Sequence, residues 1–272
     1  MNRRLFLGAL SAAVLGGAGM ARGVFAGPPH SPTAAAAAQS PHPAGGKVFP
    51  APSPPQPAPI VRVPLPGGGV LTKLPGDGNL LALTLDDGVN TDVVRLYTEF
   101  ARDTGVRLTY FVNGMYRSWT DNLAVLRPLV ESGQIQLGNH TWSHPNLTKV
   151  PASRVAQEIS RNDEFLKRTF GVAAGPYFRP PYGKHNSTVD AVAADLGYTA
   201  ITLWSGSLAD STVITEDYIV QMARKYFTGQ AIVLGHLNHP PVTHVYAQLC
   251  EVIHARNLRT VTLNDVFFAP QK

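Results

Sequence analysis

Cysteine is almost absent from this sequence: Cys250 is the only one among 272 residues. An intramolecular disulfide and a cysteine-based zinc site are therefore both excluded. Any metal must be bound by His, Asp or Glu side chains. Cys250 itself lies in an apolar stretch, and we expect it to pack on one face of a helix.

Acidic residues are missing from the N-terminal part of the chain, where Asp77 is the first Asp or Glu. The formal net charge of +5 is therefore unevenly distributed, and Arg3, Arg4 and Arg22 supply much of it. Binding to nucleic acid requires Lys and Arg clustered on one face, and no such cluster is visible in the sequence. We expect no nucleic-acid partner.

Residues 1–26 have the pattern of an export signal. Arg3 and Arg4 precede a moderately apolar run that ends near Ala21, and small residues lead up to Ala26. This is the order of a signal peptide, and the arginine pair resembles a twin-arginine signal. A retained membrane anchor is the alternative, although the run is short and glycine-rich for a span of about 20 residues. We expect a secreted or cell-wall-associated protein without stable membrane insertion after cleavage.

Residues 27–74 are rich in proline and alanine. More than half of the 23 prolines fall between residues 27 and 66, and the segment has no apolar periodicity. It cannot bury a core, so we predict a disordered linker that spaces a folded domain from a surface. The remainder, residues 75–272, is long enough for one α/β domain, which we expect to be a monomer.

Strands alternate with helices from about residue 75. Apolar runs predict strands at 80–85, 107–112, 135–137, 177–178, 199–204, 231–234 and 260–263. Periodic segments predict helices at 91–102, 122–131, 152–170, 188–196, 215–227 and 243–255. This alternation indicates a parallel α/β sheet or barrel of about seven strands.

Six polar residues fall at or just after the C-terminal ends of these predicted strands. They are Asp86, Asp87, Asn113, His140, Arg179 and His236. Barrels of this type place their catalytic groups at that face. Packing alone does not explain so many polar residues at one edge, so the sequence predicts a functional site there.

His140 and His144 are four residues apart, so one turn or tight loop can direct both imidazoles at one ion. One added carboxylate gives three protein ligands and an open fourth position, as in catalytic zinc sites. Asp86 and Asp87 are adjacent, and successive side chains of a strand alternate in direction. We therefore expect them to point different ways, one to the metal and one to a water. Spacing alone leaves open a simple Asp-Gly turn.

Four segments resemble, in order, motifs of the polysaccharide deacetylase family, also called the NodB-homology or carbohydrate esterase 4 family. Residues 83–88 resemble its Thr-Phe-Asp-Asp-Gly motif, and residues 140–144 its His-Ser/Thr-x-x-His motif. Residues 179–183, Arg-Pro-Pro-Tyr-Gly, are similar to the third motif, and residues 234–236, Leu-Gly-His, to the last. The resemblance covers residues 80–268 and implies a distorted (β/α) barrel.

The resemblance also implies roles for the site residues. Asp86 would be the general base, held by Arg179, and Asp87, His140 and His144 would bind Zn²⁺ or another divalent metal such as Co²⁺ or Ni²⁺. His236 would be the general acid, and the backbone amide of Tyr182 would help to bind the oxyanion. The residues expected to contact substrate are Tyr182, Pro181, Trp142, Asn113 and Leu234. For Trp142, ordinary packing is an equal alternative.

One motif departs from the family pattern. Where family members read Asp-Ser/Ala-x-Asp-Trp, this chain has Ser207-Leu-Ala-Asp210-Ser211. Ser207 then replaces the first Asp and Ser211 the Trp, while Asp210 remains to orient His236. The alternative is that Asp210 is an ordinary loop residue and that His236 lacks a partner.

Together these features predict an exported, metal-dependent hydrolase that removes N-acetyl groups from a polysaccharide containing N-acetylglucosamine and releases acetate. Peptidoglycan or a chitin-type polymer is the expected acetylated partner. An O-acetyl xylan esterase with the same mechanism is one alternative. A glycan-binding module with weak or no catalysis is another.

Overall fold

The computed structural model describes residues 59–268. The predicted signal peptide, residues 1–26, and residues 27–58 of the predicted linker lie outside the described residues. Residues 59–268 belong to one compact unit. Among the described residues, no helix combines the length and the apolar character that a membrane crossing requires.

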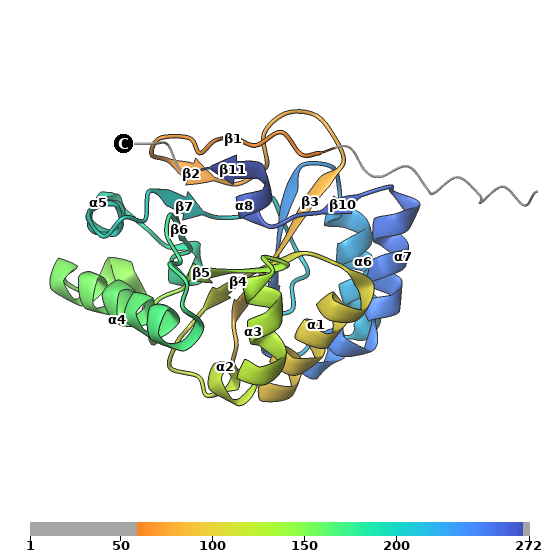
Figure 1. Cartoon of the computed structure of the whole chain (residues 1–272), viewed down its shortest axis with the longest axis horizontal. Coiled ribbons are helices and arrows are strands. Elements are labelled where there is room, and N and C mark those ends of the chain that lie inside the picture. Colours follow the sequence, from red (N-terminus) through yellow and green to blue (C-terminus); the bar gives the residue numbers. More distant parts are fainter. Residues whose placement is uncertain (1–58, 269–272) are drawn as a thin grey trace, which may run out of the picture. The chain divides into compact units, whose positions relative to one another are not determined.

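The centre of this unit is a curled sheet in which all paired strands are parallel (Figure 1). Within residues 59–268 it contains nine strands in the order β2-β7-β6-β5-β4-β3-β9-β8, with β10 also paired to β3. These are β2 (Val70–Leu71), β3 (Leu80–Asp87), β4 (Leu108–Val112), β5 (Ile135–Asn139), β6 (Tyr177–Phe178), β7 (Ala200–Thr202), β8 (Gly206–Ser207), β9 (Ala231–His236) and β10 (Arg259–Thr260). The predicted fold class, a distorted (β/α) barrel, is confirmed.

Helices follow the strands and cover the outer face of the sheet. They are α1 (Thr91–Thr104), α2 (Ser118–Asp121), α3 (Leu123–Glu131), α4 (Ala152–Phe170), α5 (Ser187–Asp195), α6 (Glu216–Tyr226) and α7 (Tyr246–Ala255). The short helix α8 (Leu263–Val266) packs instead in a second cluster at one end of the sheet. Local sequence sets their ends, as in α1. The Asn90 side chain accepts hydrogen bonds from two first-turn N–H groups, and Gly105 ends the helix in a left-handed conformation.

Side chains of β3 alternate between two hydrophobic clusters. Leu81, Leu83 and Leu85 pack in the larger cluster beneath the outer helices. Ala82, between them, packs in a second cluster on the opposite face with residues of other strands. Thr84 and Asp86 share the parity of Ala82, so the period of two carries Asp86 to the inner face of the curled sheet.

The folded unit begins earlier than the sequence analysis placed it. Residues 63–74 fall in the predicted linker, yet β1 (Val63–Pro64) and β2 already form strands there. Leu65 and Leu74 are buried in the second cluster. At the other end of the chain, β1 pairs with β11 (Phe267–Phe268). This region therefore packs beside α8 at one end of the sheet (Figure 1).

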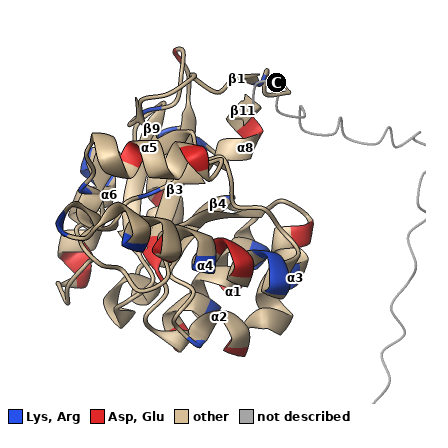
Figure 2. Ribbon diagram, turned by 90° about the vertical axis from the view of Figure 1, so that its left-hand side faces the viewer, with Lys and Arg blue, Asp and Glu red and all other residues tan. Residues whose placement is uncertain are grey.

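Acidic and basic residues are interspersed on the surrounding helices (Figure 2). For example, Arg95 lies 3.3 Å from Asp92 on α1, and Lys167 lies 2.6 Å from Asp163 on α4. Exposed pairs of this kind contribute little to stability, about 0–1 kcal/mol each. Buried charged groups gather instead near the C-terminal ends of the strands, where Asp86, Asp87 and Arg179 lie.

Parallel strands bring their C-terminal ends to the same edge. In the register of the sheet, Asp86 of β3 is directly opposite His236 of β9. His140 follows β5, and Arg179 follows β6. The predicted catalytic residues, which lie up to 150 positions apart in the chain, are therefore brought to one edge of one sheet.

Candidate active site

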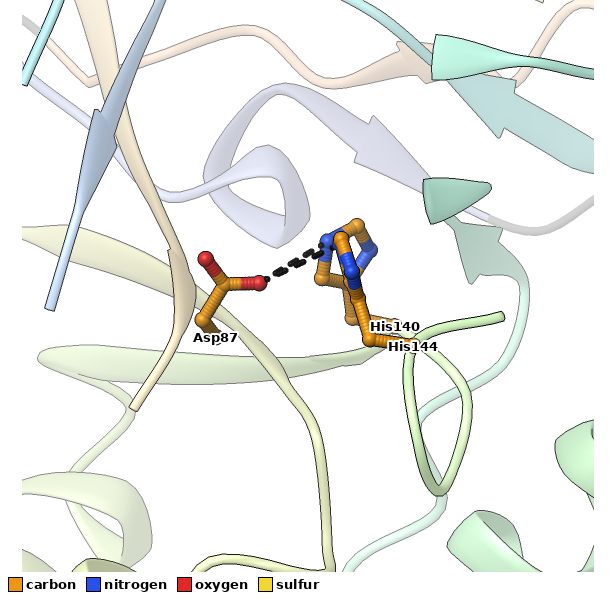
Figure 3. A group of neighbouring side chains, drawn as sticks. All are labelled: Asp87, His140 and His144. Atoms are coloured by element: carbon orange, nitrogen blue, oxygen red, sulfur yellow. Dashed lines mark ion pairs between the residues drawn. The ribbon is translucent and has the colours of Figure 1, made fainter. Parts of the chain in front are cut away.

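Asp87, His140 and His144 converge at this edge (Figure 3). Asp87 Oδ1 lies 3.4 Å from Nε2 of His140 and 3.4 Å from Nε2 of His144. This oxygen is buried and has no hydrogen-bond partner. An unpartnered buried carboxylate oxygen is costly, and a cation at this point would satisfy it.

The hydrogen bonds of His140 favour the same interpretation. Its Nδ1 lies 2.6 Å from the backbone carbonyl oxygen of Arg179, so Nδ1 carries the proton and donates it. In the neutral ring the lone pair is then on Nε2, the atom that faces Asp87. Two imidazole nitrogens and one carboxylate oxygen, all within 4.8 Å of one another, fit a divalent transition metal such as zinc.

Asp87 reaches this site because the strand geometry changes at its last residue. Regular alternation would turn Asp87 away from Asp86, as the sequence analysis expected. Instead Asp87 has a φ of 76° and Gly88 a φ of 94°. The left-handed turn directs both carboxylates to the same imidazole, with Asp86 Oδ2 lying 3.5 Å from His140 Nε2. The expectation that the two carboxylates point different ways is wrong for that reason.

Gly88 is required at this turn for space as well as for conformation. A Cβ atom at Gly88 would lie 2.2 Å from the Trp119 ring. The indole N–H of Trp119 donates to the carbonyl oxygen of Asn113 at 3.0 Å, which fixes the ring. The glycine of the Asp-Asp-Gly motif is thus needed for close packing next to a strained aspartate.

The loop that carries both histidines also has unusual backbone geometry. Thr141 and His144 have φ values of 73° and 59°, which are unfavourable for residues other than glycine. Buried Glu158 holds this loop from α4: it accepts hydrogen bonds at 2.7 Å from the backbone N–H and the hydroxyl of Ser143. These contacts offset the strain of directing two imidazoles at one point.

Asn113 also supports this loop, which corrects one prediction. It was expected to contact substrate, but it is fully buried. Its side-chain amide donates to the backbone carbonyls of His140 and Thr141. Asn113 therefore lies beneath the site and positions the histidine loop.

Asp86 is fixed by a buried arginine. Arg179 Nη1 donates to Asp86 Oδ1 at 2.7 Å, and Arg179 has no exposed surface. The other guanidinium nitrogens donate to the backbone carbonyls of Thr202 and Leu203 at 2.9 and 3.1 Å. Each guanidinium nitrogen thus donates one hydrogen bond, and the second oxygen of Asp86 remains directed toward His140.

His236, on the strand next to Asp86, is paired with Asp210. His236 Nδ1 lies 2.9 Å from Asp210 Oδ1, and the backbone N–H of His236 donates to Asp210 Oδ2 at 3.2 Å. Asp210 is therefore the partner of His236, and the alternative of an ordinary loop residue does not hold. Burial opposes protonation of His236, but the contact with Asp210 outweighs it and raises the pKa of the imidazole.

The charges around Asp87 favour a cation. Burial opposes ionisation of Asp87, yet its contacts with His140 and His144 hold the pKa of the carboxyl well below its usual range. Burial and the neighbouring His140 lower the pKa of His144 to about 4, so this imidazole is neutral at pH 7. Burial alone would lower the pKa of the His140 imidazole, but the neighbouring Asp86 and Asp87 carboxylates outweigh it and raise this pKa. A proton and a cation would compete for that ring.

These groups open into a cavity of about 570 Å³. Of the residues expected to contact substrate, Tyr182 and Leu234 line it, together with Asp86, His236 and the three metal-binding candidates. Arg179 and Asp210 lie behind Asp86 and His236 and do not line it. Pro181 is buried next to Tyr182, at the start of the short helix η2 (Pro181–Gly183). Trp142 packs instead against Phe165, with ring centroids 5.9 Å apart, which favours its packing role.

Other residues at the cavity were not identified as contacts from the sequence. Trp204, Gly183, Ser207 and Ser211 line it. Trp204 lies two residues after the end of β7 and is the last residue of the strand predicted at 199–204. The other site residues also lie at the ends of predicted strands. This position could therefore have identified Trp204 as a site residue from the sequence.

Comparisons with known proteins agree with this geometry. Residues 73–201 match the sequence model described as polysaccharide deacetylase. A chitin deacetylase of Arthroderma benhamiae is 29% identical over 204 residues, which cover 70% of this chain and 52% of that protein. A peptidoglycan-N-acetylglucosamine deacetylase of Bacillus cereus is 27% identical over 193 residues, 69% of this chain and 68% of that protein. The chain spans about half or less of the length of several other curated relatives.

Solved structures give the same result. A family 4 carbohydrate esterase from Streptomyces lividans, determined in complex with acetate, is 26% identical and has a TM-score of 0.61. The match covers 71% of this chain and 98% of that one. With its motifs meeting at one cavity and with these matches in sequence and structure, the chain is similar to members of the polysaccharide deacetylase family, the carbohydrate esterase 4 family, and residues 73–201 match that family's sequence model.

Proposed function

We propose that this protein is a metal-dependent hydrolase that removes N-acetyl groups from a polysaccharide containing N-acetylglucosamine and releases acetate. The observation that carries the proposal is the unpartnered, buried Asp87 Oδ1, 3.4 Å from two imidazole nitrogens and next to a second carboxylate. A cation site beside a free base is a combination that can hydrolyse an amide.

Asp87, His140 and His144 would hold the metal, with Zn²⁺ as the first choice and Co²⁺ or Ni²⁺ as alternatives. Their two nitrogens and one oxygen suit these ions. When bound, the ion supplies Lewis acidity, which polarises a carbonyl oxygen and makes a nearby water more acidic. The remaining steps belong to side chains of the protein.

Asp86 would act as the general base. Its Oδ1 is held by Arg179, and its Oδ2 lies 3.5 Å from His140 Nε2, so the free oxygen borders the proposed metal site. It would take one proton from the water whose oxygen attacks the acetyl carbonyl carbon. Arg179 would keep this carboxylate correctly oriented.

His236 would act as the general acid. Its Nδ1 is engaged by Asp210, which leaves Nε2 as the free ring nitrogen at the cavity. The raised pKa of His236 keeps a proton available near neutral pH. That proton would pass to the sugar nitrogen as the carbon–nitrogen bond breaks, and the products would be acetate and a free amine.

The rest of the cavity would bind the acetyl group and the sugar. Leu234 and Trp204 provide apolar surface, and the exposed ring of Tyr182 lies at the opening. Aromatic surface of this kind suits the apolar face of a sugar ring. The backbone N–H of Tyr182 would help to stabilise the negative charge that develops on the carbonyl oxygen.

The names of the relatives support an N-acetylated glycan. The Arthroderma protein is a chitin deacetylase, and the Bacillus cereus protein acts on N-acetylglucosamine in peptidoglycan. Residues 1–26 and the proline-rich segment that follows support export to the cell surface, where peptidoglycan would be accessible. We therefore rank peptidoglycan first and chitin-type polymers second, and we expect a monomer.

A panel of acetylated glycans tests the proposal. The zinc-loaded full chain is incubated with chitin oligomers, peptidoglycan and acetylated xylan, and released acetate is quantified. We expect acetate from the N-acetylated glycans. Release from acetylated xylan alone would indicate an O-acetyl esterase with the same mechanism. Binding to the glycans without any acetate would indicate a glycan-binding module, and the proposed hydrolysis would be wrong.

A further inference from the structure

Asn238 contacts Asp87 from the segment that follows β9. Its side-chain Nδ2 donates to Asp87 Oδ2 at 2.7 Å. Its Oδ1 accepts a hydrogen bond from the backbone N–H of Val89 at 3.3 Å. One amide group thus contacts the residues on both sides of Gly88, across the left-handed turn that orients Asp87.

This contact makes the two oxygens of Asp87 different. Oδ2 is occupied by Asn238, whereas Oδ1 is buried, unpartnered and 3.4 Å from both imidazole nitrogens. Carboxylates bind cations through one oxygen or through both. Binding through both oxygens would require Oδ2 to turn away from Asn238 and break their hydrogen bond.

The backbone holds Asn238 in place before any ligand binds. The N–H of Leu237 donates to the carbonyl oxygen of Asp86 at 3.0 Å, and the N–H of Asn90 donates to the carbonyl oxygen of Leu237 at 3.1 Å. These bonds join the segment before Asn238 to both ends of the turn at residues 86–90. The amide is therefore positioned by the sheet, which reduces the entropy lost in orienting it.

We infer that Asn238 is a positioning residue that selects the ligand atom of Asp87, leaving Oδ1 as the single oxygen presented to a divalent cation. The inference rests on the proposed metal site and adds to it a residue outside the three ligands. An asparagine is needed because one group must donate to Asp87 and accept from Val89. Aspartate lacks the donor, and leucine lacks both functions.

The test uses the metal-free full chain titrated with Co²⁺ and with Zn²⁺. Asn238→Leu keeps the side-chain volume and removes both hydrogen bonds, and Asn238→Ala is a second variant that avoids a buried apolar side chain. Asn264→Leu is the matched control, because Asn264 is exposed and its helix packs beside the start of β5, away from the site. The readouts are metal affinity and the visible absorption spectrum of bound Co²⁺.

We expect both Asn238 variants to bind metal on the order of 10- to 100-fold more weakly. We also expect weaker visible absorption from Co²⁺, because the freed Oδ2 becomes an additional ligand. The Asn264→Leu protein should match the wild type in both measurements.

Two results would overturn the inference while leaving the proposed function intact. One is wild-type affinity and spectrum in both Asn238 variants. The other is weaker binding with an unchanged Co²⁺ spectrum, which would assign Asn238 to loop stability alone. Failure of the wild-type chain to bind either metal would overturn both the inference and the proposed function.

Discussion

Arg179 Nη1 lies 2.7 Å from Asp86 Oδ1 in the interior of the curled sheet, and neither side chain is more than slightly exposed. The guanidinium also lies over the Phe111 ring, 4.1 Å from its centroid. Desolvating such a pair costs free energy that the hydrogen bonds must offset. Its position beside the proposed metal site suggests that the fold retains it for catalysis.

Removing one partner of this pair should destabilise the protein strongly. In Arg179→Met, Asp86 loses its buried ion-pair partner, so the free energy of unfolding should fall by about 3–5 kcal/mol. Urea denaturation followed by circular dichroism measures the change. Arg117→Met is the control: Arg117 is almost fully exposed, and its loss should change stability by about 0.5 kcal/mol or less. Equal effects of the two substitutions would contradict the assignment.

Asp86 and His144 should separate catalysis from metal binding. Asp86→Asn removes the base but none of the three proposed ligands, so the rate of acetate release should fall by about 10²- to 10⁴-fold with metal retained. His144→Ala removes a ligand and should lose metal and activity together. Metal content per chain and acetate release are measured on both proteins. Loss of metal from Asp86→Asn would show that the roles of Asp86 and Asp87 are assigned wrongly.

Asp210 should set the alkaline limit of activity through His236. The general acid works only when protonated, so activity is present below the pKa of His236 and is lost as the pH rises through it. Asp210 raises that pKa. In Asp210→Asn the pKa should fall, and the alkaline limb of the kcat/KM profile should move to lower pH. An unchanged alkaline limb would mean that another group donates the proton.

Glu158 should stabilise the histidine loop without touching the metal. Glu158→Gln replaces one acceptor oxygen by an amide, so a contact with Ser143 is lost beneath two strained residues. The free energy of unfolding should fall by about 1–3 kcal/mol. Zinc affinity should weaken by about tenfold. Glu164→Gln, at an exposed position of the same helix, is the control and should leave both quantities unchanged.

The sequence predicts the layout of the fold and the location of the site. A continuous apolar run ending in two aspartates predicts β3, and polar residues after successive strands predict a single active edge. Resemblance to a known family assigns the roles of residues such as Asp86 and His236. The two-residue strands β2 and β8 were not predicted, because segments so short show no periodicity.

Features that depend on an unusual backbone conformation, or on contacts between residues far apart in the chain, could not be predicted from the sequence. The direction of Asp87 follows from a positive φ that overrides strand alternation. The contact of Asn238 with Asp87 joins residues 151 positions apart, and the sequence gives no indication of it. Asn113 was placed correctly at a strand end, but only its burial distinguishes support of the loop from contact with substrate.

The most direct test of the account is a metal dependence measurement on one substrate. Acetate release from glycol chitin is followed for the full chain after chelation, and again after one equivalent of Zn²⁺ per chain is restored. The account predicts that activity disappears with the metal and returns at one ion per chain, with no return in His140→Ala. Undiminished acetate release from the metal-free protein, or equal recovery in His140→Ala, would contradict it.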